Sequence, residues 1–189
     1  MSKTSFFSTI LMVVLAACAQ PNEVGRATYL SSEPVIQMTA AGIGAINAET
    51  PYSRAAIVEA LPGFEFANVT TMSEGEVRHL LAAFRGGMQQ LQFEPGTSGK
   101  IARVHIVGQE AAGPNGERIG MTYTESGAAA LNCVPGAEEW SRMALCTTPD
   151  RRLVYIYAPE AYEGPDGQLP PDNILRSSRL VRIVWNPHP

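Results

Sequence analysis

The sequence repeats its turn signals at a constant offset, and this repeat limits the fold more than any other feature. Ile46 and Ile119 are 73 residues apart, each within a glycine-rich stretch. The pairs Pro62-Gly63 and Pro135-Gly136 are separated by the same distance, and each follows a stretch with helix signals. A shared offset of this kind is typical of an internal duplication. We therefore predict two tandem units, each a helix followed by strands.

The first unit opens with a predicted helix. Thr50 suits the N-cap, and Pro51 suits the first helical position, where its missing N–H costs no hydrogen bond. Apolar residues then recur at helical spacing on one face, namely Ala56, Ile57, Ala60 and Leu61. Segments with strand character follow between turn signals, at 64–71, 79–85, 89–94 and 100–107.

The second unit has the same order. Thr122 and Glu125 have the spacing of a capping box, which satisfies backbone N–H groups at the start of a helix. The following alanine run predicts a helix in which Ala129 or Ala130 and Leu131 are buried, and which ends at Pro135-Gly136. Strands are predicted at 142–146, 153–157 and 180–185.

Together these elements predict an α+β domain, in which one antiparallel sheet carries both short helices on one face. Such units look like the tandem units of the beta-lactamase inhibitor protein fold. This likeness concerns architecture only and is weak evidence about activity. The alternative is that two unrelated α+β stretches share ordinary helix punctuation.

The N-terminus has the pattern of a lipoprotein export signal. Lys3 precedes an apolar run at 6–15. That run is too short to cross a membrane, which takes about 20 helical residues, but it suits a signal peptide. Leu15-Ala16-Ala17-Cys18 resembles the lipobox of bacterial lipoproteins; an ordinary signal with a chance cysteine is the alternative. We predict a cleaved signal at 1–17, a lipidated Cys18 with a flexible tether at 18–37, and one domain at 38–189 with half-units at about 38–108 and 112–187.

Lipid on Cys18 would hold the chain at a membrane, because each buried methylene contributes about 0.8 kcal/mol. Residue 19 is alanine and not aspartate, which favours sorting to the periplasmic face of the outer membrane. The net charge of −4 argues against a nucleic-acid partner, which needs a basic surface. With 45% hydrophobic and 17% charged residues, the full chain has the composition of a globular protein.

Two cysteines remain after lipidation, Cys133 and Cys146. An even pair in an oxidising compartment predicts a disulfide. A free thiol or a metal ligand is a weaker interpretation, because no histidine lies near either cysteine in the sequence.

Two segments resemble the RpoE-regulated lipoproteins, small envelope proteins of unknown biochemical function. They are 42–63 and 163–172, the second followed by Leu175, Val181, Ile183 and Trp185. The resemblance extends over about 38–186, and the two late cysteines match it in position. It implies an envelope location and a link with envelope stress, and it supplies no catalytic residues.

No motif in the chain predicts catalysis. Gly42-x-Gly44 lacks the third glycine of a dinucleotide loop, and no G-x-S-x-G pattern is present. The three histidines, His79, His105 and His188, do not have the spacing of metal ligands. We expect His105 to point away from the core, in a solvated or paired state. The prediction is a non-enzymatic protein without cofactor or metal.

The most distinctive stretch runs from 160 to 172, where prolines stiffen the chain and lower the entropy lost on docking. Tyr162 and Leu169 are candidate anchors for a partner, with Asp166 and Asp172 around them. The alternative is that the loop covers the sheet and that Tyr162 and Leu169 complete the core.

The predicted function is to bind or support another envelope component, either a protein or peptidoglycan. Inhibition of a periplasmic enzyme is the alternative, and an unrecognised hydrolase has less support.

The lipobox makes a direct prediction about Cys18. Cys18→Ser should remain unprocessed by lipoprotein signal peptidase and should take up no radiolabelled palmitate, because the acylated thiol is missing. Cys146→Ser is the matched control and should be labelled like the wild type. Normal labelling of Cys18→Ser would contradict the lipobox.

Overall fold

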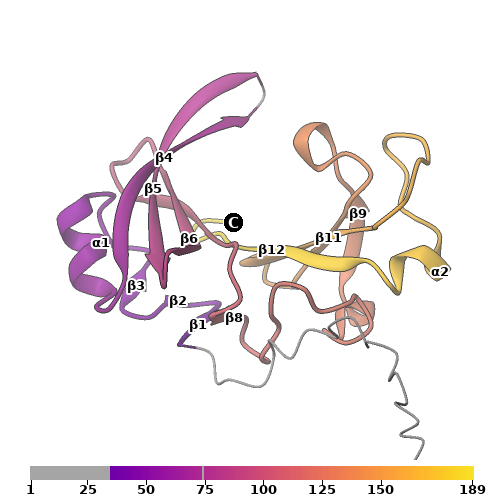
Figure 1. The fold of residues 1–189 in the computed structure, drawn as a ribbon, viewed down its shortest axis with the longest axis horizontal. Coiled ribbons are helices and arrows are strands. Elements are labelled where there is room, and N and C mark those ends of the chain that lie inside the picture. Colours follow the sequence, from indigo (N-terminus) through magenta and orange to yellow (C-terminus); the bar gives the residue numbers. More distant parts are fainter. Residues whose placement is uncertain (1–34, 74) are drawn as a thin grey trace, which may run out of the picture.

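The computed structural model describes residues 35–73 and 75–189 (Figure 1). The predicted signal at 1–17, Cys18 and nearly all of the tether lie outside the described residues. The strands of the described part form two sheets. One is an eight-stranded antiparallel sheet in the order β4-β5-β6-β7-β12-β11-β10-β9, and the other is a four-stranded mixed sheet in the order β3-β2-β1-β8.

The large sheet consists of two meanders that meet at their last strands. The first contains β4 (Glu65–Ser73), β5 (Glu76–Arg85), β6 (Met88–Pro95) and β7 (Ile101–Ile106). The second contains β9 (Asn132–Pro135), β10 (Ala144–Thr147), β11 (Leu153–Ala158) and β12 (Arg179–Trp185). Because β7 pairs with β12, the strand order of the second meander mirrors that of the first. The predicted strands are confirmed in both halves.

One face of the large sheet carries the core. Its strands alternate, so that Leu91 and Phe93 of β6 and Ile183 and Trp185 of β12 are completely buried while their neighbours face the other side. The helix α1 (Arg54–Ala60) contributes to the same core cluster through Ile57. Burying each such side chain contributes about 1.5–3 kcal/mol. The alternation of apolar residues along the strands therefore decides which face of the sheet packs against the core.

The small sheet closes one side of this core. Its strands are β1 (Ile36–Thr39), β2 (Gly42–Ile43), β3 (Ile46–Asn47) and β8 (Ala111–Ala112). Gly42 has φ +148°, and a Cβ there would lie 1.9 Å from the carbonyl oxygen of Ile46. The glycine-rich entry is therefore a tight hairpin. The indole N–H of Trp185 donates to the carbonyl oxygen of Ala40 over 3.1 Å and joins the two sheets.

The start of the first helix was predicted wrongly. The N-cap is Ser53, whose hydroxyl accepts from the N–H of Ala56 over 3.2 Å. Thr50 instead accepts from the N–H of Asn47 through its hydroxyl, and Pro51 forms a bridge with Lys100. These contacts hold 50–51 in an extended conformation, so the helix begins later.

The second predicted helix was also wrong. Thr122 and Glu125 do exchange the hydrogen bonds of a capping box, but only a 3-10 turn at Ala128–Ala130 follows. The N–H of Tyr123 donates to the carbonyl oxygen of Ser178, so that this backbone is held by the chain before β12. In the core cluster Ala128 is buried, whereas Ala129 and Ala130 are exposed and Leu131 is half-buried. Pro135 ends the strand β9 and does not end a helix.

The second helix of the described chain is α2 (Asp172–Leu175), a single turn just before β12. With α1, it makes the domain mostly β and only loosely α+β. No helix among the described residues is long and apolar enough to cross a membrane. The mirrored strand order agrees with a duplicated unit, and the duplication itself stays a prediction.

The predicted disulfide is present. Cys133 and Cys146 lie directly opposite each other on β9 and β10, with Cα atoms 4.0 Å apart, and Cys146 is completely buried. A crosslink that closes a loop of this length contributes about 3 kcal/mol in the chain-entropy model. It ties the short edge strand β9 to the sheet.

Candidate functional site

The outer face of the large sheet, opposite the core, carries a hollow. Figure 1 shows the β4–β5 hairpin and the loop between β9 and β10 rising on the same side of the sheet. Between them lie two adjoining cavities of about 480 and 250 Å³. We call them together the sheet hollow, and both are lined by Arg78, Glu94, His105, Glu139 and Trp140.

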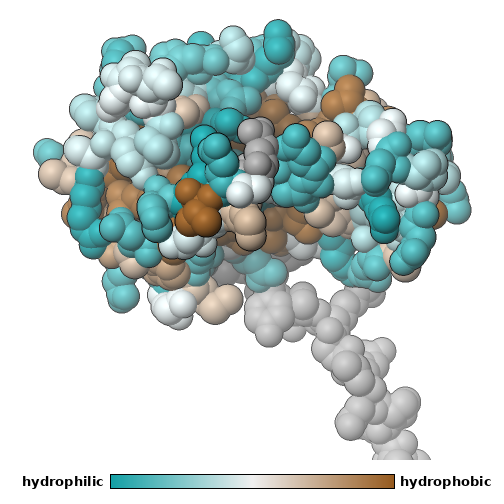
Figure 2. All heavy atoms as spheres, turned by 90° about the horizontal axis from the view of Figure 1, so that it is seen from above, coloured by the Kyte–Doolittle hydropathy of each residue, from teal (hydrophilic) through white to brown (hydrophobic). Residues whose placement is uncertain are grey.

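Viewed from the side of the hairpin tip, the surface is mostly hydrophilic, with hydrophobic atoms gathered in its middle (Figure 2). In the larger cavity the second meander supplies an apolar floor of Leu145, Val154, Ile156 and Val184, and in the smaller cavity the first meander adds Met72 and Leu80. The charged part comes mainly from the first meander. The hollow is therefore amphipathic.

Glu94 and His105 form the buried part of this site. Gln92 and Glu94 of β6 lie opposite His105 and Arg103 of β7, which places all four side chains on the outer face. The imidazole Nε2 lies 2.8 Å from Oε1 of Glu94, although the ring is not aligned for a straight hydrogen bond. Arg103 Nε lies 3.1 Å from the other carboxylate oxygen of Glu94. Glu94 is thus contacted from two sides, by the cation of Arg103 and by the ring of His105.

Arg182 continues this chain of contacts from β12. Its Nη1 donates to Oε1 of Gln92 over 2.9 Å and contacts Nδ1 of His105 over 3.2 Å. The guanidinium carbon lies 5.0 Å from the ring centre of Trp140, within the range of a cation–π contact. Glu94, His105 and Arg182 therefore form one connected series.

The protonation of this series follows from burial. Burial lowers the pKa of His105 below its ordinary value, against the charge of Glu94, which raises it. Burial raises the pKa of Glu94, but its contacts with His105 and Arg103 outweigh burial and hold that pKa below its ordinary value. Because Nδ1 accepts from Arg182, the proton of the neutral imidazole lies on Nε2, facing Glu94.

This arrangement positions a cation and does not present a catalytic base. Both nitrogens of His105 already have neighbours, so neither is open to a substrate. Neither serine nor cysteine lines the sheet hollow. No group of metal-ligand side chains occurs among the described residues.

The predicted binding loop lies outside the sheet hollow. Asp166 contacts the hydroxyl of Ser141 and lies 3.7 Å from Nε of Arg142, so it braces the β9–β10 loop. Leu169 and Asp172 are exposed, and Tyr162 is half-buried. Neither Tyr162 nor Leu169 belongs to the core cluster, so the alternative that they complete the core is wrong. A binding role for this loop stays a prediction.

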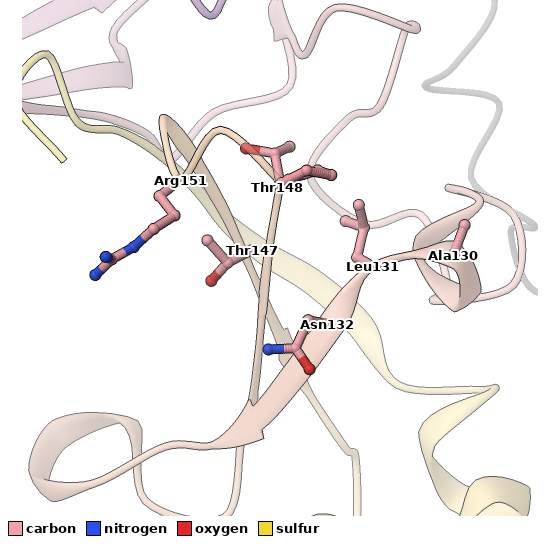
Figure 3. A pocket seen from close by; sticks show the side chains of 7 residues that line it. Ala130, Leu131, Asn132, Thr147, Thr148 and Arg151 are labelled. Carbon is pink, nitrogen blue, oxygen red and sulfur yellow. The ribbon is translucent and has the colours of Figure 1, made fainter.

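A second cavity, of about 470 Å³, lies at the end of β9 and β10 (Figure 3). Asn132, Thr147 and Thr148 line it, and Arg151 supplies its one charged side chain. It contains no pair of acid and base. On the core side, Glu117 accepts hydrogen bonds from Asn115 and Tyr155, which makes it a structural group with satisfied oxygens.

Most of this site has no signal in the sequence. His105 was expected to be solvated or paired on the outer face, and the structure shows it paired and buried. Arg182 and Trp140 were not identified, because they are 77 and 35 residues from His105 and belong to no motif. Pro135-Gly136 was interpreted as the end of a helix and 142–146 as a strand, and neither pattern predicts a loop over the sheet.

The fold and the sheet hollow define a small β-rich domain whose outer sheet face carries a cluster of charged side chains. Residues 27–187 match the family described as protein of unknown function DUF1131, and the chain belongs to that family.

Two similarities accompany the family match. The chain is 23% identical over 180 residues to a protein of Escherichia coli strain K12 named uncharacterized protein YfeY, covering 94% of this chain and 90% of that protein. The crystal structure of that E. coli protein aligns with a TM-score of 0.64 and 22% identity, over 79% of this chain and 99% of the other. At this identity the likeness shows the fold.

The depressed pKa of His105 makes stability depend on pH. Below pH 6.5, the ordinary pKa of histidine, His105 binds a proton in the unfolded chain but stays neutral in the folded chain. The free energy of unfolding should therefore fall as pH decreases. The contribution of Glu94 is present above its ordinary value of 4.5 and is lost as pH falls through its lower folded value. Urea titrations between pH 7.5 and 4 measure both parts.

His105→Gln removes the titrating ring but keeps a donor and an acceptor. It should cost about 1 kcal/mol at pH 7.5 through weakened hydrogen bonding, and the fall that starts near 6.5 should shrink. Equal pH profiles for the variant and the wild type would contradict the buried neutral imidazole.

Proposed function

We propose that this protein is a non-catalytic lipoprotein, anchored through Cys18 at the periplasmic face of the outer membrane, and that its sheet hollow binds a segment of another envelope component. The observation that carries the proposal is that the charged groups of the hollow hold one another in place. Glu94 contacts His105, and His105 contacts Arg182. Groups fixed before a partner arrives lose little entropy on binding.

The position of the hollow relative to the anchor supports this proposal. The described chain begins at β1, on the opposite side of the molecule from the tip of the β4–β5 hairpin (Figure 1). With lipid on Cys18, the tether would approach from the β1 side. The sheet hollow would then face away from the membrane, toward the periplasm.

Two finer expectations belong to the same proposal. The resemblance to RpoE-regulated lipoproteins supports a role under envelope stress. The mirrored meanders, with β7 and β12 as equivalent closing strands, support a duplicated unit. The hollow then lies where the two copies of the unit join into one sheet. Inhibition of a periplasmic enzyme is a second form of the same function, because the hairpin and the β9–β10 loop form two raised walls around the hollow.

Site-specific photo-crosslinking in living cells tests the proposal. A benzophenone amino acid at Thr71 or Leu145 places the reactive group on the wall or floor of the hollow. Val58 of α1, 41% exposed and on the core side of the sheet, is the control position. We expect discrete envelope adducts from Thr71 and Leu145 and none from Val58. Adducts of equal pattern from all three positions, or none from the hollow, would contradict the proposal.

A further inference from the structure

We propose that the sheet hollow recognises a carboxylate carried by an extended, otherwise apolar peptide segment of a partner protein, and that Arg182 binds this carboxylate. The inference rests on the proposed function and names the chemistry of its ligand.

The hydrogen bonds of Arg182 leave one edge of its guanidinium open. A guanidinium has five N–H donors. The two on Nη1 are directed at Gln92 and His105. Among the hydrogen bonds and ion pairs of the described residues, none involves Nε or Nη2 of Arg182. These two nitrogens form the planar fork that matches the two oxygens of a carboxylate.

The open edge is held in a fixed orientation. Trp140, in the 3-10 turn Glu138–Trp140, lies against the guanidinium. Gln92 and His105 accept hydrogen bonds from its Nη1. A guanidinium with a fixed plane loses little freedom when it binds. Burial also lowers the pKa of Arg182, against the charges of Glu94 and Glu139, so the cation is partly desolvated and gains from an added anion.

The formal charges that line the hollow balance, with three arginines (Arg78, Arg103, Arg182) and three glutamates (Glu94, Glu138, Glu139). Glu94 is already paired with Arg103, and its other carboxylate oxygen faces the neutral ring of His105. Arg78 lines both cavities of the hollow and has no hydrogen bond or ion pair within the described part of the chain. Neither Arg78 nor Arg182 forms a salt bridge with these acids in the described part of the chain, so a carboxylate can pair with Arg182 without displacing one of them.

The apolar floor decides between a peptide and a glycan. Leu145 and Val154 offer aliphatic surface above the buried Ile156 and Val184, which suits the side chains of a peptide. A sugar ring would need an open aromatic face and many polar partners, but one face of Trp140 is already covered by Arg182. The observations therefore favour a protein segment over peptidoglycan.

A defined probe tests the inference on the mature protein. The probes are a capped peptide Val-Asp-Val-Leu and its counterpart with Asn in place of Asp, titrated against protein labelled with 15N. We expect the Asp peptide to shift the Nε–H signal of Arg182 and the indole signal of Trp140 saturably, with about tenfold tighter binding than the Asn peptide. The indole signal of Trp185, bonded to Ala40 on the core side, is the internal control and should not move.

Substitution of Arg182 distinguishes specific recognition of a carboxylate from general attraction between opposite charges. Arg182→Lys keeps the charge but loses the fork, and should reduce the preference for Asp over Asn to less than threefold. Arg151→Lys, exposed beside the cavity at the end of β9 and β10, should keep it. Equal binding of the two peptides by the wild type would overturn the inference whether or not the variant folds. An unchanged preference in folded Arg182→Lys would do the same.

The outcomes also separate this inference from the proposed function. Envelope adducts at Thr71 and Leu145 together with equal binding of the two peptides would leave the hollow as a binding surface and remove its carboxylate specificity. A peptidoglycan fragment in those adducts would contradict the protein partner.

Discussion

The antiparallel pairing of β7 with β12 is the interaction on which the rest of the structure depends. It joins two four-stranded meanders through only three residue pairs, Val104 with Trp185, His105 with Val184, and Ile106 with Ile183. Because side chains alternate across a sheet, this register puts Trp185 in the core and His105 on the outer face. A shift by one residue would put Trp185 and His105 on the same face, so the same pairing decides the core and the candidate site.

The outer face of the large sheet largely buries two polar side chains, Glu94 and His105, where apolar ones would be usual. Moving the Glu94 carboxylate and the His105 ring out of water has a cost that good pairing only offsets, so this buried polar contact is weak evidence for stability. Apolar side chains at these positions would close the face at least as well. The series from Glu94 through His105 to Arg182 is better explained by what it does to Arg182, which is to orient one guanidinium edge over an apolar floor.

The sequence predicted the parts of the fold that depend on local pattern. Alternation located the strands, including Ile101–Ile106 and Arg179–Trp185, and cysteine count predicted the disulfide. The second helix was wrong because the backbone at 122–124 bonds to the chain before β12, a tertiary contact that capping signals cannot show. The site was missed for the same reason: His105 and Arg182 meet only through the β7–β12 pairing, so neither one belongs to a local motif.

Measuring the protonation state of His105 is the most direct test that the series from Glu94 to Arg182 holds the guanidinium in place. Long-range 15N–1H correlation at pH 7 distinguishes the two neutral tautomers of an imidazole from the charged ring. The account predicts a neutral ring with its proton on Nε2, toward Glu94, and an unprotonated Nδ1 that accepts from Arg182. A proton on Nδ1, or a charged imidazolium at pH 7, would show that the series does not hold the guanidinium, and would contradict the account.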